Sequence, residues 1–321
     1  MTGSRNLLIA GAILALISAP FLTGNTYLHH LMVLWMLYSL AALSLNIIVG
    51  YLGELSFGHA AFFGIGAYAT AILSTRLGAP ALLGLIVGGI VAGLFGAVIG
   101  YVALRIRGPQ FAILTLGFGM IIYTVTTYWV DLTRGPMGIS NIPLFSFGGA
   151  LPELATAREN YLLALAFVLA CAYLCHALTQ SRTGRAFIAV RENHALAASL
   201  GIDVFRMKWL GFVAATAMAG VAGALYAHYI RVITPEMMGL QYMAALIIIV
   251  VVGGRGTILG PLLGALVYVG LLELLRAAGP LRMVIFASLL TASVIFLPGG
   301  VISLAARRLR LGGVEDSRAT S

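Results

Sequence analysis

Long apolar runs recur from one end of this sequence to the other, and most are long enough to cross a lipid bilayer. A hydrocarbon core of about 30 Å requires about 20 apolar residues in a helix. Hydrophobic residues make up 61% of the 321 residues and charged residues 9%. A soluble protein of this size has too little interior to bury so much apolar surface. The sequence therefore predicts an all-α, polytopic integral membrane protein.

We expect about ten transmembrane helices in a single domain over residues 1–310, followed by a polar, disordered tail at 311–321. The run at 240–252 makes only about 20 Å of helix. It either begins earlier, near Ile233, or is a broken or re-entrant piece. The predicted spans lie at roughly 7–22, 28–49, 58–75, 80–104, 110–130, 161–179, 208–230, 240–252, 257–275 and 281–297.

The basic residues lie mostly in alternate loops, which indicates the orientation of the chain. Both termini are expected in the cytoplasm, because cytoplasmic loops collect Arg and Lys. The net charge of +9 is then explained by basic residues in the loops that flank a lipid bilayer, and it does not indicate a nucleic-acid partner. We keep the first run as a span, not a cleaved signal peptide, since no clear A-x-A site follows it. The outer side holds only Arg76, Arg134, Arg158, Arg231, Arg276 and Arg282.

Motifs for nucleotide-driven or hydrolytic chemistry are missing from the sequence. The only lysine, Lys208, lies outside any GxxxxGK[ST] pattern, and neither HExxH nor GxSxG occurs. Carriers driven by protons or sodium usually need polar groups at mid-membrane, and the spans offer no convincing set. We therefore predict a transport subunit with no catalytic, metal or cofactor site, moved by an outside energy source. An ATP-independent channel or secondary carrier and a membrane scaffold remain as alternatives.

One polar segment, at 181–207, carries start and stop signals for a short helix. Asn193 is a good N-cap, the stretch HALAASL favours helix, and Gly201 suits the C′ position. So short a helix is unstable alone and is expected to dock on a cytoplasmic partner, although a basic loop resting on headgroups is the alternative. Leu196 and Leu200 form an apolar knob at i, i+4 spacing. The predicted interface comprises Arg185, Arg191, Glu192, Asn193, Ala195, Leu196, Ala198, Leu200 and Gly201.

Glycines follow two patterns. Most of them, such as Gly84 and Gly88, have small-xxx-small spacing, which is typical of close helix packing in membranes. Two clusters, at 50–68 and 251–260, interrupt apolar runs in the two halves of the chain and indicate broken helices around a transport path. Plain loop turns are the alternative. The predicted path residues are Asn46, Ser56, His59, Thr115, Gly253 and Gly254, although hydrogen bonding between helices would explain the polar ones equally well.

Four smaller features complete the predictions. Cys171 and Cys175 are interpreted as small buried hydrophobes. His228 is expected to reach the membrane interface from a span end, and Glu273 and Arg276 to form an ion pair at a span edge. The polar stretch at 131–160 is expected to be an external loop or cap.

Several stretches resemble the permease subunits of branched-chain amino acid ABC importers. The segment SRTGRAFIAVRENHALAASLGI is similar to their cytoplasmic coupling segment. The resemblance covers residues 38–276 and identifies the family better than the solute, because related permeases serve amides, urea or aromatic acids. The other similar stretches, in the family's order, are NIIVGYLGELSFGHAAFFGIGAYATAIL, TRGPMGISNIP, AGVAGALYAHYIRVITPEMM and IIIVVVGGRGTILGPLLGAL.

This resemblance implies a multi-pass permease of the bacterial inner (plasma) membrane. Its partners would be a second homologous permease subunit, two cytoplasmic ABC ATPases that bind the ATP, and a periplasmic or extracellular solute-binding protein. Residues 193–201 would sit in an ATPase groove, and the loops at 131–160 and 231–239 would face the binding protein. The sequence departs from the family at 134–136, where Arg-Gly-Pro stands in place of a Gly-Gly-Ser type stretch.

Overall fold

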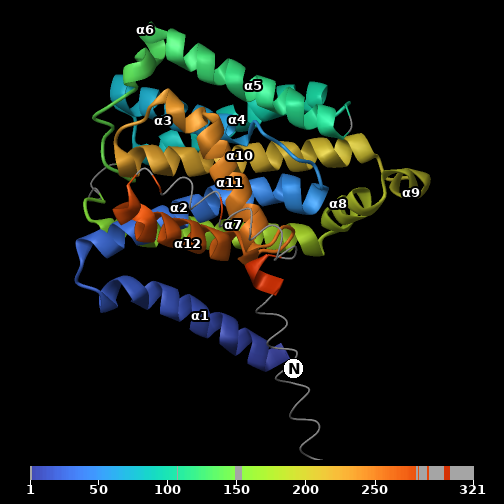
Figure 1. The fold of residues 1–321 in the computed structure, drawn as a ribbon, viewed down its shortest axis with the longest axis horizontal. Coiled ribbons are helices and arrows are strands. Elements are labelled where there is room, and N and C mark those ends of the chain that lie inside the picture. Colours follow the sequence, from blue (N-terminus) through green and yellow to red (C-terminus); the bar gives the residue numbers. More distant parts are fainter. Residues whose placement is uncertain are drawn as a thin grey trace, which may run out of the picture.

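Long helices run back and forth between two ends of the molecule (Figure 1). The computed structural model describes residues 2–106, 108–148, 154–279, 281, 288 and 300–303. These residues are helical apart from connecting loops and two isolated β-bridges. The elements are α1 (Thr2–Leu22), α2 (Thr26–Asn46), the π-helix η1 (Ile47–Leu52), α3 (His59–Leu77), α4 (Ala81–Ala103), α5 (Pro109–Tyr128), α6 (Val130–Thr133), η2 (Gly135–Met137), α7 (Ala157–Gln180), α8 (Arg182–Glu192), α9 (His194–Ser199), α10 (Val204–Ile230), η3 (Pro235–Met238), α11 (Leu240–Gly253), α12 (Leu259–Leu274) and η4 (Leu275–Ala278).

Six described helices are long and apolar enough to cross a membrane, whereas ten spans were predicted. These six are α2 with η1, α3, α4, α5, α7 and α10. Shorter apolar helices occupy 13–22, 240–253 and 259–274. The predicted span at 281–297 and the tail at 311–321 lie outside the described residues, 281 and 288 excepted. The structure therefore supports a polytopic membrane protein with six candidate spans plus shorter helices.

The run at 240–252 forms one arm of a helical hairpin. Gly239 caps α11, and η3 precedes it as a separate turn, so the helix does not begin near Ile233. α11 has 14 residues and α12 has 16, which at 1.5 Å per residue is about 21 and 24 Å. Between them the chain turns at Gly254, whose φ of 122° strongly favours glycine. The interruption at the second glycine cluster is therefore a turn between two helices, and its place beside a transport path stays a prediction.

The centre of the bundle is built from α3, α4 and α10, which pack closely through small residues. A Cβ on Gly66 would overlap the backbone of Gly220, and one on Gly88 would lie 2.9 Å from the Gly66 carbonyl oxygen. Backbones this close are possible only where neither helix carries a side chain at the crossing. The small-xxx-small pattern therefore has the packing role predicted for it.

Several side chains near span ends turn inward. Cys171 and Cys175 are free and buried, as predicted. Arg276 Nη1 lies 3.6 Å from Glu273 Oε1, which confirms that ion pair. His228 corrects a prediction, since it is buried and not at an interface. It hydrogen-bonds the Pro143 carbonyl at 2.9 Å and the Thr70 hydroxyl at 3.1 Å, so it fastens a loop onto α3 and α10.

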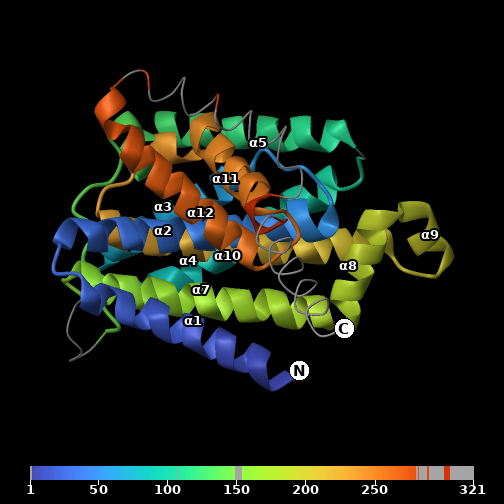
Figure 2. The ribbon, with the colours of Figure 1, turned by 60° about the horizontal axis from the view of Figure 1, so that its bottom comes forward.

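The two ends of the bundle differ. α8 and α9 extend beyond the other helices at one end, which we call the coupling end (residues 181–203; Figures 1 and 2). The opposite end, the loop end, carries residues 130–145 and 231–239. There Ile139 and Ile233 exchange backbone hydrogen bonds of 3.0 Å, and Arg231 Nε donates to the Ile142 carbonyl at 3.0 Å. The two loops predicted to share a face therefore pack against each other.

Candidate functional site

The short helix α9 has the caps that the sequence predicted. The Asn193 side-chain oxygen accepts hydrogen bonds of 3.0 Å from the backbone amides of Ala195 and Leu196. At the other end, Gly201 has a φ of +80° and donates to the Ala198 carbonyl, while the next amide reaches back to Ala197. This pair of bonds is a Schellman motif, which satisfies the last carbonyls of a helix. The segment is therefore a defined helix and not an extended basic loop.

Two leucines stand out from the surface of α9. Leu196 is 59% exposed and Leu200 is 71% exposed. Ala195 and Ala198 beside them are also exposed, whereas Ala197 is buried on the side that faces the body of the protein. Within the described residues nothing covers this apolar knob. Its shape and exposure suit a groove on another protein.

A second helix, α8, attaches α9 to the bundle. Ser181 caps it by accepting from the Gly184 amide at 3.0 Å, and Phe187 and Val190 are buried. Arg185 points away and donates to the Gln180 carbonyl at 2.8 Å. This helix was not predicted, although the Ser181 cap and the spacing of Phe187 and Val190 would have indicated it. α8 is thus an anchored stem for α9.

Arg191 remains partly exposed, with its side chain 35% accessible, and it also contacts η1, so its predicted place at the docking interface stays a prediction. Its Nη1 donates to the Gly50 carbonyl in η1 at 2.7 Å. Its Nε and Nη2 donate to Glu192 Oε1 at 3.1 and 2.6 Å. The Arg191 side chain also lies over Gly53, where a Cβ would come within 2.6 Å of the Arg191 Cγ. The guanidinium therefore links α8, the stem of α9, to η1.

The two glycine clusters meet at the coupling end. Asn46 is buried, and its side-chain nitrogen donates to the Thr257 carbonyl while its oxygen accepts from the Gly256 amide, both at 2.8 Å. A Cβ on Gly50 would lie 2.8 Å from the Gly256 Cα and would overlap the Gly256 amide nitrogen. A Cβ on Gly253 would overlap the Gly260 carbonyl. The breaks after η1 and after α11 therefore fit against each other.

The other predicted path residues lie around the start of α3. His59 is buried and its Nε2 lies 2.8 Å from the Ser44 hydroxyl. The Thr115 hydroxyl accepts from the Phe57 amide at 3.1 Å. In the part of the chain that the structure describes, the buried Ser56 hydroxyl and His59 Nδ1 have no hydrogen-bond partner. His59 thus makes the kind of interhelical bond that was the alternative role, whereas Asn46 and Thr115 bond backbone groups of connecting turns, and lining a path stays a prediction.

A buried ion pair was not predicted. Lys208 in the second turn of α10 pairs with Glu54, and their side chains are only 4% and 9% exposed. The sequence offered two indications of this pair, a single lysine at the start of an apolar run and a carboxylate, Glu54, within the first glycine cluster. The pair joins α10 to the segment that follows η1.

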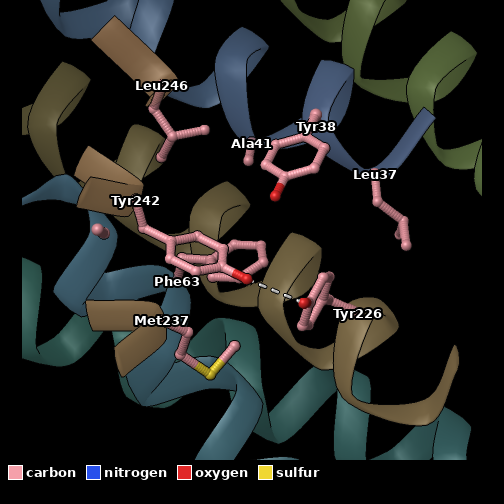
Figure 3. A pocket seen from close by; sticks show the side chains of 9 residues that line it. Leu37, Tyr38, Ala41, Phe63, Tyr226, Met237, Tyr242 and Leu246 are labelled. Carbon is pink, nitrogen blue, oxygen red and sulfur yellow. Dashed lines mark hydrogen bonds between the residues drawn. The ribbon is translucent and has the colours of Figure 1, made fainter. Parts of the chain in front are cut away.

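Two cavities differ in size and character. A cleft of about 630 Å³ opens at the coupling end between η1, α8 and the turn after α11. A second cavity, of about 10 Å³, lies between α2, α3, α10, η3 and α11, where the hydroxyls of Tyr226 and Tyr242 are 3.1 Å apart (Figure 3). That space holds about one water molecule, so solutes cannot enter it in this conformation. The cleft is lined by Val49, Gly50, Gly53, Glu54, Leu55, Arg191, Glu192 and Arg255.

Replacing Asn193 with alanine is expected to unravel α9. The change removes the acceptor for two backbone amides, which costs about 1 kcal/mol in a helix too short to persist alone. Hydrogen–deuterium exchange should therefore speed up across 194–200. Ser199→Ala is the control, because its hydroxyl only bonds back to Leu196 within α9. Equal exchange in both variants would show that the cap does not hold the helix.

Comparisons with known proteins place these features in a family. The family model described as "Branched-chain amino acid transport system / permease component" matches residues 27–297. The branched-chain amino acid permease protein LivM of Escherichia coli K12 is 30% identical over 332 residues, covering 97% of this chain and 78% of its own length. LivH of the same organism is 28% identical, covering 83% and 91%. A probable LivM of Methanocaldococcus jannaschii is 25% identical, covering 74% and 79%.

Proposed function

Because this chain belongs to the family of branched-chain amino acid transport system permease components, we propose that α9 is the element through which cytoplasmic ATPases drive it. The chain is the permease component of a branched-chain amino acid ABC transport system, and such a component has no ATPase domain. This membership argues against the ATP-independent channel or carrier. The observation that carries the proposal is the exposed leucine pair on a helix capped at both ends.

In this proposal the chain forms half of a translocation path, and a second homologous permease forms the other half. The similarity to both LivM and LivH supports such a pairing. Two cytoplasmic ABC ATPases hold the α9 helices of the pair, and ATP binding draws the ATPases and these helices together. The spans then alternate between outward and inward openings. Residues 1–310 then form one transmembrane unit, and both termini lie in the cytoplasm.

The loop end receives the solute in this proposal. The loops at 131–160 and 231–239 form the surface on which a solute-binding protein docks, on the side of the membrane opposite the ATPases. The Ile139–Ile233 bridge supports this role, because it holds the two loops together as one surface. Affinity for the amino acid then lies with the binding protein. The membrane path, with Ser56, His59 and Thr115 near the helix breaks, therefore needs few specific contacts.

The double variant Leu196→Asp, Leu200→Asp is expected to release the ATPase and abolish uptake. Burying a leucine side chain contributes about 1.5–3 kcal/mol, so losing both should weaken binding by at least about 100-fold. Copurification of the ATPase with the membrane-extracted permease measures this. Arg182→Asp is the control, since it also changes the net charge by two units but lies at the start of α8. Undiminished copurification of the ATPase with the double variant would contradict the proposal.

A further inference from the structure

We propose that Arg191 is a positioning residue that transmits the movement of α9 to both helix breaks. The inference rests on the proposed function, in which an ATPase moves α9. It gives the partly exposed Arg191 a second role, as a link from α8 to η1, beside its predicted place at the docking interface. The observations that carry it are the hydrogen bond from Arg191 to η1 and the contacts between η1 and the turn after α11.

The Arg191 guanidinium occupies a helix end that needs a donor. Gly50 lies within the last turn of η1, where backbone carbonyls lack a partner inside the helix. Arg191 Nη1 fills this need at 2.7 Å, and a cation is favourable at the C-terminal end of a helix. Glu192 Oε1 accepts from two other nitrogens of the same guanidinium, which fixes the orientation of the fork. A displacement of the stem therefore acts directly on η1.

From η1 the link continues to the second break. A Cβ on Gly256 would lie 3.0 Å from Arg191 Nη1 and 3.2 Å from the Gly50 carbonyl oxygen, so the guanidinium touches both breaks. Asn46, at the junction of α2 and η1, bonds the Gly256 amide and the Thr257 carbonyl with its two side-chain atoms. Thr257 in turn accepts from the Gly260 amide at the start of α12. η1 thus cannot shift without moving the turn that joins α11 and α12.

Residues 50–54 are contacted both from the segment that precedes α9 and from the segment that follows it. Arg191 precedes α9 at the end of α8, and Lys208 follows it in α10. Both side chains reach back to residues 50–54, Arg191 to the Gly50 carbonyl and Lys208 to Glu54. A movement of α9 is therefore transmitted to residues 50–54 through both the Arg191–Gly50 and the Lys208–Glu54 contacts. The large cleft lies beside both contacts, with Arg191 and Glu54 on its wall.

Arg191→Gln in the complete transporter is expected to uncouple transport from ATP hydrolysis. Glutamine keeps much of the length of the arginine side chain but lacks the positive charge and the forked guanidinium group. With permeases, ATPases and binding protein reconstituted in liposomes, the ATPase should remain bound and hydrolyse ATP, while uptake per ATP falls roughly tenfold, as for loss of a charge-assisted hydrogen bond. Arg191→Lys should restore part of the ratio, because an ammonium can still donate to Gly50. A merely structural role would lower hydrolysis and uptake together.

Two further variants keep the test decisive. Asn46→Asp loses the donor to Thr257 at the far end of the link and should uncouple in the same way without touching α8. Arg206→Gln is the control, an exposed arginine on the other flank of α9, and should leave uptake per ATP unchanged. If Arg191→Gln left the uptake per ATP hydrolysed unchanged, or if Arg206→Gln lowered it as well, the inference would be overturned. Loss of bound ATPase from Arg191→Gln would assign Arg191 to the docking interface alone, whereas retention of ATPase by the Leu196/Leu200 variant would refute the proposed function instead.

Discussion

Gly223→Ala is expected to remove most of the folded protein from the membrane, although it adds a single methyl group. A Cβ at this position would overlap the Phe63 carbonyl oxygen and would lie 2.8 Å from the Phe63 carbonyl carbon and 3.1 Å from the Ala67 amide nitrogen. All three are backbone atoms of α3, so no side chain can rotate away. α3 and α10 would have to separate, and the neighbouring Gly66–Gly220 contact would open with them.

Overpacking of this kind costs about 1–3 kcal/mol and occasionally more, and a backbone clash belongs at the upper end. The yield and thermal midpoint of the detergent-extracted protein, followed by size-exclusion chromatography, would measure the loss. Gly117→Ala and Gly270→Ala are matched controls, because a Cβ on either meets nothing within 4 Å. Both sites are helical, so alanine should stabilise them by up to about 1 kcal/mol. Midpoints that fall equally in all three variants would show that the α3–α10 approach is not the cause.

The second large effect is expected at the buried ion pair. Lys208→Met leaves the Glu54 carboxylate buried without its partner, and breaking such a pair costs about 3–5 kcal/mol. Glu54→Leu alone should be costly for the same reason, because the ammonium is then stranded. The double variant replaces both charges by apolar groups of similar volume, which is often neutral. We therefore expect the double variant to be more stable than either single one.

A double-mutant cycle on thermal or denaturant unfolding of the extracted protein would measure this coupling. The free-energy changes of the two single variants should sum to far more than that of the double variant. Arg206→Met is the control for loss of a cation close to Lys208 at the start of α10, and since Arg206 is exposed it should cost little. Additive costs in the cycle would mean that Lys208 and Glu54 do not interact in the folded protein.

Features that depend on nearby residues were predictable. The caps of α9 involve Asn193 and Gly201, each within a few residues of the groups it satisfies, so the sequence contains all the information. The glycine clusters were identified as helix breaks for the same reason. The number of membrane spans was harder to predict from the sequence. Hydropathy does not distinguish a helix that crosses the membrane fully from one arm of a hairpin such as α11 and α12.

The sequence by itself determined that this chain is a helical membrane protein, that a short capped helix lies between Asn193 and Gly201, and which family it resembles. Each of these depends on composition or on local order along the chain. Only the tertiary structure decided that Gly50 lies against Gly256, that Arg191 donates to the Gly50 carbonyl, that Lys208 meets Glu54 and that His228 is buried. Most of these partners are more than 80 residues apart. Their contacts depend on which helix faces meet, and an apolar environment allows many pairings until close packing and the pairing of buried polar groups select one.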